Sequence, residues 1–391
     1  MFVYTVAIIF NTIDPVMQIS SNFDSGNIRV IDASQANNIQ LEIVKDNQSD
    51  FYQWFHFKLH NTERCEHTLH LMNASTSAYL EGWTDYQAVA SYDREHWFRV
   101  PTEFDGEKLS ITLTPEFDSV YFAYFAPYSY ERHQDLLHQA QLDIDCQLQV
   151  LGQTLDGLDV SLLKVGEEGE GKKVIWLTAR QHPGESMAEW FMEGFIDRLL
   201  DEDDGVARSL LNSAVFYLVP NMNPDGSVRG HLRTNAVGTN LNREWAEPSM
   251  ERSPEVYLVR EKMLATGVDM FLDIHGDEAL PFNFVAGCEG VPAYNAKHQA
   301  LEEKFKAILL AVTPEFQDDK GYDKDEPGQA NLTVGANWVG NNFKCLSYTV
   351  EMPFKDNDLL PDHSVGWSDN RSSLFGRDFL TAIYHVVGEL R

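Results

Sequence analysis

The sequence predicts an α/β protein in which an all-β sandwich precedes a mixed, mostly parallel β-sheet flanked by helices. Three observations support this. Residues 38–130 hold short segments of alternating hydrophobicity without a convincing helix, and the rest of the chain alternates strand and helix patterns. The 391 residues also exceed the size at which one core usually stops growing. We expect residues 17–140 to form the β-sandwich and residues 141–391 to form the second domain.

Five segments of the first domain are predicted to be strands because apolar and polar residues alternate along them. These are residues 39–44, 54–59, 68–72, 108–113 and 120–125. An aromatic-rich turn then leads into a predicted helix, residues 131–142, that links the two domains. Residues 1–16 are partly apolar but lack the basic region and cleavage site of a secretory signal, so we expect a start-site artefact or a disordered tail.

The second domain opens with a predicted hairpin around a turn at Asp156-Gly157. Strands and helices then alternate, which is typical of a mixed or largely parallel sheet covered on both faces. The predicted strands are residues 147–151, 160–165, 173–179, 214–219, 268–274 and 345–350, and the predicted helices are residues 187–200, 254–266, 296–312 and 374–390. Residues 313–342, rich in Gly, Asn and Asp, are predicted to be a mobile loop or lid.

Composition excludes several classes of protein. The chain has 30 Lys and Arg against 60 Asp and Glu, and we find no basic cluster of the kind that a nucleic-acid-binding face requires. No apolar run is long enough to span a membrane. The four cysteines are widely spaced, and three lie in apolar or strand-like runs, which favours free thiols in a reducing compartment. We therefore expect a cytoplasmic protein.

The run His182-Pro183-Gly184-Glu185-Ser186 lies between a predicted buried strand and a predicted helix. Pro183 disfavours helical dihedral angles at His182, whereas Glu185 falls in the first helical turn, where the positive helix end favours a carboxylate. The imidazole and the carboxylate can therefore converge, and both suit zinc. The same His-x-x-Glu spacing occurs twice more in the chain, so the spacing alone does not identify a metal site. The location of this motif after a predicted strand supports it, because ligands of open α/β sheets bind at the carboxyl ends of strands.

Two further strand ends complete the candidate metal site. His275 follows the predicted strand of residues 268–274 and supplies a third protein ligand, which leaves a fourth position for water. Glu278 is a geometric alternative to Glu185, but it falls in a predicted loop. Glu351 ends another apolar strand, and a carboxylate beside zinc can take the proton of the bound water.

Turn-forming segments between these strands carry candidate substrate-binding residues. Residues 220–226, 229–233 and 238–243 are dense in Asn, Asp, Pro and Gly, which indicates tight turns. Arg233 and Arg243 suit an anionic ligand beside a metal, because a guanidinium binds a carboxylate in a bidentate manner. Without a metal, surface charges would explain them equally well.

In this order the motifs resemble those of the zinc carboxypeptidases, and specifically the bacterial form of the cytosolic carboxypeptidase, or tubulin deglutamylase-like, subfamily. The resemblance covers most of the chain from about residue 17. The motifs that carry it are His182-Pro183-Gly184-Glu185-Ser186, Asn223-Pro224-Asp225-Gly226, Asn240-Leu241-Asn242-Arg243, His275 and Ser347-Tyr348-Thr349-Val350-Glu351. Residues 122–130 resemble the end of that subfamily's amino-terminal β-domain.

The resemblance implies an enzyme with one Zn²⁺ per chain that hydrolyses the C-terminal peptide bond of a peptide or protein. Its implied roles are zinc ligands for His182, Glu185 and His275, general base for Glu351, oxyanion stabilisation for Arg233, and binding of the terminal carboxylate for Asn242 and Arg243. The subfamily also implies release of acidic residues such as Glu. Lys320, Lys324 and Lys344 are the candidate cations for such a side chain.

Three positions depart from the subfamily pattern. Asn240 stands where an Asp is usual, so an amide replaces a carboxylate that would support a zinc-binding histidine. His231 stands where an Asn is common. The tyrosine that the wider family uses near the scissile bond has no obvious counterpart, and Tyr322 is a candidate from its loop position alone.

Other functions remain open on the sequence. The same zinc site would serve a γ-glutamyl or peptidoglycan peptidase, or an N-acyl amino acid deacylase. A binding module that has lost catalysis is disfavoured, because His182, Glu185, His275 and Glu351 are all present. The sequence leaves the oligomeric state and the natural substrate undetermined.

Overall fold

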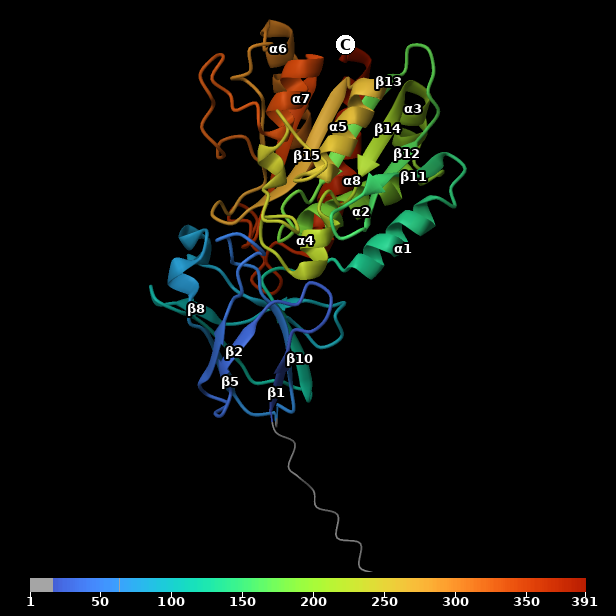
Figure 1. The fold of residues 1–391 in the computed structure, drawn as a ribbon. Coiled ribbons are helices and arrows are strands. Elements are labelled where there is room, and N and C mark those ends of the chain that lie inside the picture. Colours follow the sequence, from blue (N-terminus) through green and yellow to red (C-terminus); the bar gives the residue numbers. More distant parts are fainter. Residues whose placement is uncertain (1–16, 63) are drawn as a thin grey trace, which may run out of the picture.

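A computed structural model describes residues 17–62 and 64–391, so the expectation for residues 1–16 lies outside the described part of the chain. Figure 1 shows a β-rich amino-terminal domain below an α/β domain, with helix α1 (Tyr130–Ala140) following the last strand of the β-rich part. This arrangement confirms the predicted fold class.

The β-rich domain contains two five-stranded sheets, with strand orders β1-β4-β10-β6-β7 and β2-β3-β5-β9-β8. The strands of the first are β1 (Gln18–Ser20), β4 (His56–His60), β10 (Ser119–Ala123), β6 (Val89–Ser91) and β7 (Phe98–Arg99). Those of the second are β2 (Arg29–Asp32), β3 (Ile39–Glu42), β5 (His67–Leu71), β9 (Leu109–Leu113) and β8 (Thr102–Phe104). Buried side chains from both sheets join one apolar core, as a sandwich requires.

The five strands predicted here are β3, β4, β5, β9 and β10, while the sequence pattern missed the other five. The missed strands have two to four residues each, which is too short for an alternation of side chains to stand out.

The α/β domain is built on a seven-stranded sheet of order β11-β12-β14-β13-β15-β17-β16. Strands β13, β14, β15 and β17 run parallel, whereas β11, β12 and β16 pair antiparallel to their neighbours, so the sheet is mixed. The bounds are β11 (Cys146–Gln153), β12 (Asp159–Val165), β13 (Lys173–Ala179), β14 (Ala214–Val219), β15 (Met270–Asp277), β16 (Phe284–Ala286) and β17 (Leu346–Pro353).

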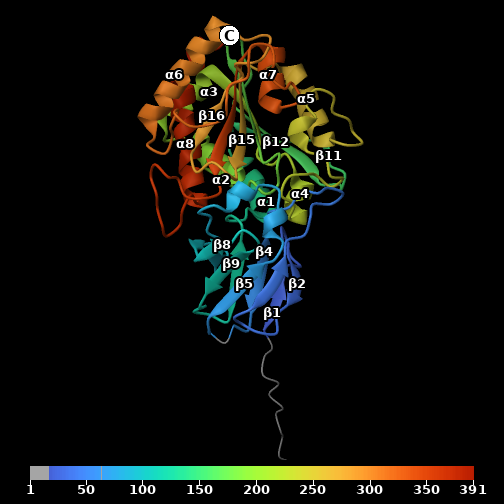
Figure 2. The same ribbon diagram turned by 90° about the vertical axis from the view of Figure 1, so that its left-hand side faces the viewer.

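Helices cover both faces of this sheet, as Figure 2 shows. The helices are α2 (Met187–Leu199), α3 (Gly205–Ser213), α4 (Pro224–Arg229), α5 (Pro254–Thr266), α6 (Ala296–Val312), α7 (Gly335–Phe343) and α8 (Asp369–Val386). Along β13, Ile175 and Leu177 pack in the core formed with α2, α6 and α8, while Trp176 packs in the core formed with α5 and α7. Burial on both faces explains why this strand is a continuous apolar run.

The prediction of a loop through residue 342 is wrong at its end, because residues 335–343 form α7. Two of the Gly residues and three of the Asn residues that suggested a loop, namely Gly335, Gly340, Asn337, Asn341 and Asn342, lie within this helix. Helices α3 and α4 and strand β16 were also missed. Side chains cap the first two: Asp204 accepts from the amides of Val206 and Ala207, and Asn223 accepts from that of Gly226.

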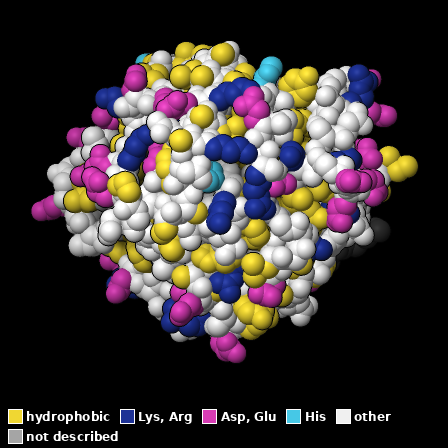
Figure 3. Space-filling view, turned by 90° about the horizontal axis from the view of Figure 1, so that it is seen from above, with side chains coloured by type: hydrophobic (Ala, Val, Ile, Leu, Met, Phe, Trp, Pro, Cys, Tyr) yellow, Lys and Arg dark blue, Asp and Glu magenta, His cyan; other side chains and the backbone are white. Residues whose placement is uncertain are grey.

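The cysteines follow the predictions, whereas the basic side chains are distributed less evenly than the composition suggests. Cys146, Cys288 and Cys345 are buried and Cys65 is exposed, and all four are free thiols. Every helix in the described chain is too short or too polar to cross a membrane. Seen from above, in the view of Figure 3, basic side chains gather near the middle of one face among scattered acidic ones, a local grouping that the overall composition does not reveal.

The crossing of α2 and α8 depends on two glycines. A Cβ atom on Gly376 would overlap the carbonyl oxygen of Phe191, and one on Gly194 would overlap that of Ser373. We expect Gly376→Ala to lower the free energy of unfolding by about 1–3 kcal/mol, the usual cost of overpacking. Urea unfolding followed by tryptophan fluorescence measures this, with Gly388→Ala as the control because its added Cβ has no atom within 4 Å. Equal stability of the two variants would contradict the tight crossing.

Candidate active site

The three predicted zinc ligands meet at the carboxyl ends of two neighbouring parallel strands. His182 follows β13, Glu185 precedes α2, and His275 lies near the end of β15. One potential ligand atom from each residue lies within 4.8 Å of the others, and all three side chains are buried. The pairing of Ala179 with Ile274 in the sheet explains this meeting, because both chains reach the same edge in register.

Both imidazoles direct Nδ1 at the carboxylate of Glu185. His182 Nδ1 lies 2.6 Å from Oε1, and His275 Nδ1 lies 2.7 Å from Oε2. Burial opposes ionisation of Glu185, but the two histidines outweigh burial and hold its pKa below the usual range. Burial lowers the pKa of His182 to about 4, which keeps that imidazole neutral. Imidazole nitrogens with one carboxylate form a donor set that fits zinc and leaves a coordination position free for water.

The second nitrogen of each histidine has a supporting oxygen. His182 Nε2 lies 3.1 Å from Asn240 Oδ1, and His275 Nε2 lies 3.1 Å from Asp273 Oδ2. An amide therefore supports the first histidine and a carboxylate the second. Sequence reasoning missed Asp273, although a residue two positions before His275 on a strand necessarily points to the same face.

A buried ion pair holds the turn that carries His182. Arg180 Nε donates to the carbonyl oxygen of Pro183 at 2.9 Å, and its Nη1 donates to Glu189 Oε2 at 2.7 Å. Glu189 also accepts from Asn221 Nδ2 and lies 2.6 Å from His133 Nδ1 of α1. Sequence reasoning missed this network because its members, which range from His133 to Asn221, meet only in the folded chain.

Glu351 stands beside the metal ligands because it pairs with His275 in the register of β15 and β17. Its Oε1 lies 3.1 Å from the hydroxyl oxygen of Tyr322, and Oε2 has no partner among the described residues. Burial raises the pKa of Glu351 well above its usual value; the nearby carboxylates of Glu185 and Asp277 add to this, while His275 opposes it. Such a carboxyl group suits the uptake and return of a proton.

Tyr322 approaches Glu351 from the loop before α7. Its hydroxyl donates to Asp277 Oδ2 at 2.6 Å, and its ring packs against Phe284 with a centroid separation of 4.9 Å. The tyrosine that the sequence indicated only by its loop position therefore lies at the site.

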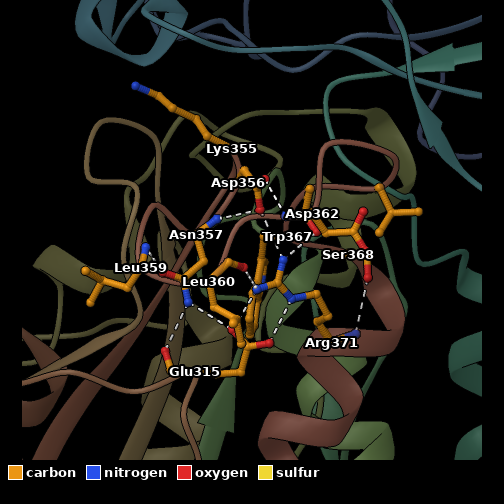
Figure 4. Close-up of polar contacts among 12 residues, drawn as sticks. Glu315, Lys355, Asp356, Asn357, Leu359, Leu360, Asp362, Trp367, Ser368 and Arg371 are labelled. Carbon is orange, nitrogen blue, oxygen red and sulfur yellow. Dashed lines mark hydrogen bonds and ion pairs between the residues drawn. The ribbon is translucent and has the colours of Figure 1, made fainter.

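The far end of this loop is anchored to the carboxy-terminal helix. Arg371 of α8 binds Glu315 through two nitrogens, at 2.9 and 2.7 Å, and binds Asp356 at 3.1 Å (Figure 4). Asn357 donates to the same Glu315 carboxylate at 2.9 Å. These contacts fix the start of the segment that carries Tyr322.

Arg233 and Arg243 place two positive charges in the site. Neither guanidinium forms an ion pair within 4.0 Å among the residues that the structure describes. The pKa of Arg243 is lowered by burial and by the neighbouring charge of Arg233. Two guanidinium groups in one cleft, neither in an ion pair, create a local demand for an anion.

Asn242 is already engaged by the protein. Its Oδ1 accepts from the amide of Gly335 at 2.8 Å, and its Nδ2 lies 3.3 Å from His275 Nε2. Its backbone carbonyl accepts from Arg243 Nη1 at 2.7 Å. Asn242 thus braces a candidate substrate-binding arginine, and its side chain lies beside the Nε2–H that His275 donates to Asp273.

All seven predicted site residues line one cleft of about 770 Å³. They are His182, Glu185, Arg233, Asn242, Arg243, His275 and Glu351. Glu278 lines the cleft too, but it is not among the three groups able to share a metal ion. Tyr79 of the β-rich domain also faces the cleft, which the sequence did not indicate.

Two of the three lysines predicted to bind an acidic side chain of the substrate line the cleft. Lys320 and Lys324 line the cleft, whereas Lys344 is exposed at the end of α7 and does not, so that expectation is wrong. Lys306 of α6, which the sequence analysis missed, lines it as well. Two of these lysines are paired, Lys306 with Asp318 at 2.8 Å and Lys324 with Glu289 at 2.9 Å.

Comparison with protein families agrees with this geometry. The family model for zinc carboxypeptidases matches residues 136–365, and that for the cytosolic carboxypeptidase N-terminal domain matches residues 19–125. The chain belongs to the zinc carboxypeptidase family. It is a zinc-dependent metallocarboxypeptidase, which acts on the C-termini of peptides or proteins.

Individual relatives cover most of this carboxypeptidase. Cytosolic carboxypeptidase 6 of Caenorhabditis elegans is 30% identical over 370 residues, which is 85% of this chain and 78% of the relative. A metallo-carboxypeptidase of Burkholderia cenocepacia superposes with a TM-score of 0.94 at 47% identity, covering 96% and 100% of the two chains. A metallo-carboxypeptidase of Pseudomonas aeruginosa, solved with (2-guanidinoethylmercapto)succinic acid, gives a TM-score of 0.93 at 50% identity and the same coverage.

The ligand assignment predicts the metal content of variants. We expect the native carboxypeptidase to carry one zinc ion per chain and His275→Ala to lose it on dialysis, because two remaining ligands bind weakly. Elemental analysis of the dialysed proteins measures this. His138→Ala, which removes an exposed histidine of α1, is the control and should retain zinc. Full zinc content in His275→Ala would show that another group holds the ion.

Proposed function

We propose that this carboxypeptidase hydrolyses the last peptide bond of its substrate with Glu351 as the general base and Arg233 as the oxyanion-binding group. The observation that carries the proposal is that one cleft holds a zinc-compatible triad, a buried carboxyl group beside it, and two unpaired guanidinium groups. These are the parts that hydrolysis next to a free carboxylate requires.

The metal, held by His182, Glu185 and His275, supplies Lewis acidity that eases deprotonation of water. Glu351 takes the proton of the attacking water on its unpartnered Oε2 and returns it to the leaving amine. The Tyr322 hydroxyl lies beside the other oxygen of Glu351 and so limits the orientations of the carboxyl group.

The positive charge of the two arginines in the cleft favours binding of the C-terminal end of the substrate. Arg243, braced by Asn242, binds the terminal carboxylate of the substrate, which aligns the last peptide bond with Glu351. Arg233 donates to the carbonyl oxygen as negative charge develops on it, and this favours the transition state over the bound substrate. An internal peptide bond offers no carboxylate at this position, so removal of a single terminal residue follows.

We further propose a preference for acidic terminal residues. Lys306, Lys320 and Lys324 line the wall of the cleft and provide cations for a side-chain carboxylate. Lys306 and Lys324 are now paired with Asp318 and Glu289, so an acidic side chain would compete with those carboxylates. The ligand of the Pseudomonas aeruginosa relative carries both a succinic acid core and a guanidino group, so it supports recognition of a carboxylate in such a cleft but not of an acidic side chain.

The setting proposed for this activity is the cytoplasm, where four free thiols are stable.

Substitution of Glu351 tests the mechanism. Glu351→Gln preserves the shape of the side chain but cannot accept a proton, so we expect kcat to fall by about 10²–10⁴-fold while zinc content is unchanged. Release of free amino acid from peptides measures kcat. Glu303→Gln, on the exposed face of α6, controls for the loss of one negative charge. A Glu351→Gln enzyme that retains both zinc and near-native kcat would exclude this residue as the base.

The same assay, run over a panel of substrates, tests specificity. Peptides ending in Glu, Leu and Lys should be cleaved in that order of kcat/KM. Faster cleavage of Lys would overturn the acidic preference but not the carboxypeptidase mechanism. γ-Glutamyl peptides and N-acyl amino acids belong in the panel, because turnover of these alone would assign the cleft to a different amide bond.

A further inference from the structure

The β-rich domain reaches into the catalytic cleft at Arg233. The guanidinium carbon of Arg233 lies 5.5 Å from the ring centroids of both Phe51 and Tyr79, which belong to that domain. Aromatic rings at this distance attract a guanidinium and restrict its movement without neutralising it. The arginine side chain is therefore guided by residues outside the α/β domain.

The backbone around Arg233 is held by one carboxylate of the same domain. Asp46 Oδ1 accepts from the amide of Leu232 at 2.7 Å, and Oδ2 accepts from the amides of Arg233 at 2.8 Å and Thr234 at 2.9 Å. The hydroxyl of Thr234 donates to Oδ2 as well, at 3.0 Å. Hydrogen bonds from amides to a carboxylate are among the stronger ones, and here three consecutive amides converge on one group.

Burial of the Asp46 carboxylate is unfavourable unless it accepts these hydrogen bonds. The residue is 3% exposed, and among the described residues it has no cationic partner within 4.0 Å. Burial of an unpaired carboxylate is unfavourable, so the amides of residues 232–234 carry its compensation. This tie would weaken if the backbone of Arg233 moved.

Neighbouring contacts seat the whole turn on the β-rich domain. Asn47 donates from its backbone amide to His231 Nε2 at 3.1 Å and from its side chain to the carbonyl of Ala236 at 2.7 Å. Asn27 donates to the carbonyl of Gly230 at 2.7 Å. His231, which departs from the subfamily's common Asn, is thus used at this interface.

Two glycines bracket the turn and allow the close approach. Gly230 and Gly238 have φ angles of 69° and 78°, in the region that favours glycine. A Cβ atom on Gly230 would lie 2.6 Å from the carbonyl oxygen of Ser25, and one on Gly238 would overlap that of Gln48. Both neighbouring carbonyls belong to the β-rich domain.

The same turn contacts the segment that carries the zinc ligands. The carbonyl of Leu232 accepts from the amide of Gly184 at 2.9 Å, while the amide of Leu232 donates to Asp46. One peptide segment is therefore fixed from both sides, by the β-rich domain and by the turn between His182 and Glu185.

We propose that Asp46 is a positioning residue for catalysis, and that the β-rich domain is a working part of the active site because it sets the location of Arg233. The inference rests on the proposed role of Arg233 as the oxyanion-binding group. A displacement of about 1 Å in such a group can cost about 10²-fold in rate. Asparagine at position 46 would direct an NH₂ group at amide donors, so it would lose at least one of the bonds and repel the turn.

A double-mutant cycle tests this proposal. The four proteins are the native enzyme, Asp46→Asn, Arg233→Ala and the double variant, each assayed with zinc content measured. We expect Asp46→Asn to lower kcat by about tenfold or more with KM within about twofold, because transition-state stabilisation is lost. In the Arg233→Ala background the same change should alter kcat by less than about twofold.

Asp24→Asn is the matched control. Asp24 also belongs to the β-rich domain and accepts from the amide of Tyr130, at the start of α1, at 2.9 Å, but among the described residues no hydrogen bond joins it to the turn of Arg233. We expect Asp24→Asn to have an unfolding temperature similar to that of Asp46→Asn. Its kcat, in contrast, should stay close to that of the native enzyme. Thr234→Val, which removes only the hydroxyl bond to Asp46, is a milder probe if Asp46→Asn does not fold, and its loss of kcat should also vanish without Arg233.

Each result decides the inference. Equal losses of kcat from Asp46→Asn, or from Thr234→Val, with and without Arg233 would show a structural role only and overturn the inference while leaving the proposed function intact. A native kcat in Arg233→Ala alone would remove the oxyanion role of that arginine and the inference with it. Absence of turnover by the native enzyme on every peptide would instead refute the proposed function.

Discussion

The rest of the site depends on the interaction of the buried Glu185 carboxylate with the imidazoles of His182 and His275. A buried anion is costly unless it is compensated, and here the two histidines supply the compensation. The sheet makes the contact possible, because neighbouring parallel strands deliver His182 and His275 to one edge. The next strand in the sheet adds Glu351 in register with His275. Strand order thus determines which side chains meet.

The charges of the site divide into two groups with different supports. Around the triad, Asp273, Asn240 and the Arg180–Glu189 pair hold the ligands from within the α/β domain. Arg233 is held from the other side, by Asp46 and two aromatic rings of the β-rich domain. In a protein with a net charge of −30, two unpaired guanidinium groups in one cleft localise attraction for an anion where the overall charge would repel it.

Local signals in the sequence were enough for much of this architecture. The buried strands β13 and β14 are continuous apolar runs, and α5 is bounded by Pro254 and Gly267, so their limits were predicted closely. Four of the seven site residues lie at or beside strand ends and three lie in turn-forming segments, and the structure brings all seven to one cleft. Apart from β3, the strands of two to four residues show too little alternation to be recognised, and the Gly and Asn content of α7 resembles a loop, so these elements escaped prediction.

Supporting residues were missed for a different reason. Asp46 is an ordinary loop aspartate in the sequence, and its role appears only when it meets a turn 187 positions further on. Arg180 and Glu189 are likewise defined by contacts with α1 and with the turn of Pro183. Lys344 was overestimated because its place at the end of α7 could not be seen before the helix was known.

The position of the bound metal tests the central claim most directly. A crystal structure of the zinc-loaded protein, with anomalous difference maps recorded on both sides of the zinc absorption edge, locates the ion without assumptions about its ligands. We expect one peak about 2.0–2.2 Å from Nδ1 of His182, Nδ1 of His275 and a carboxylate oxygen of Glu185, with Glu351 beside it. A peak coordinated instead by Glu278 or Asp273, or located away from the ends of β13 and β15, would contradict this account.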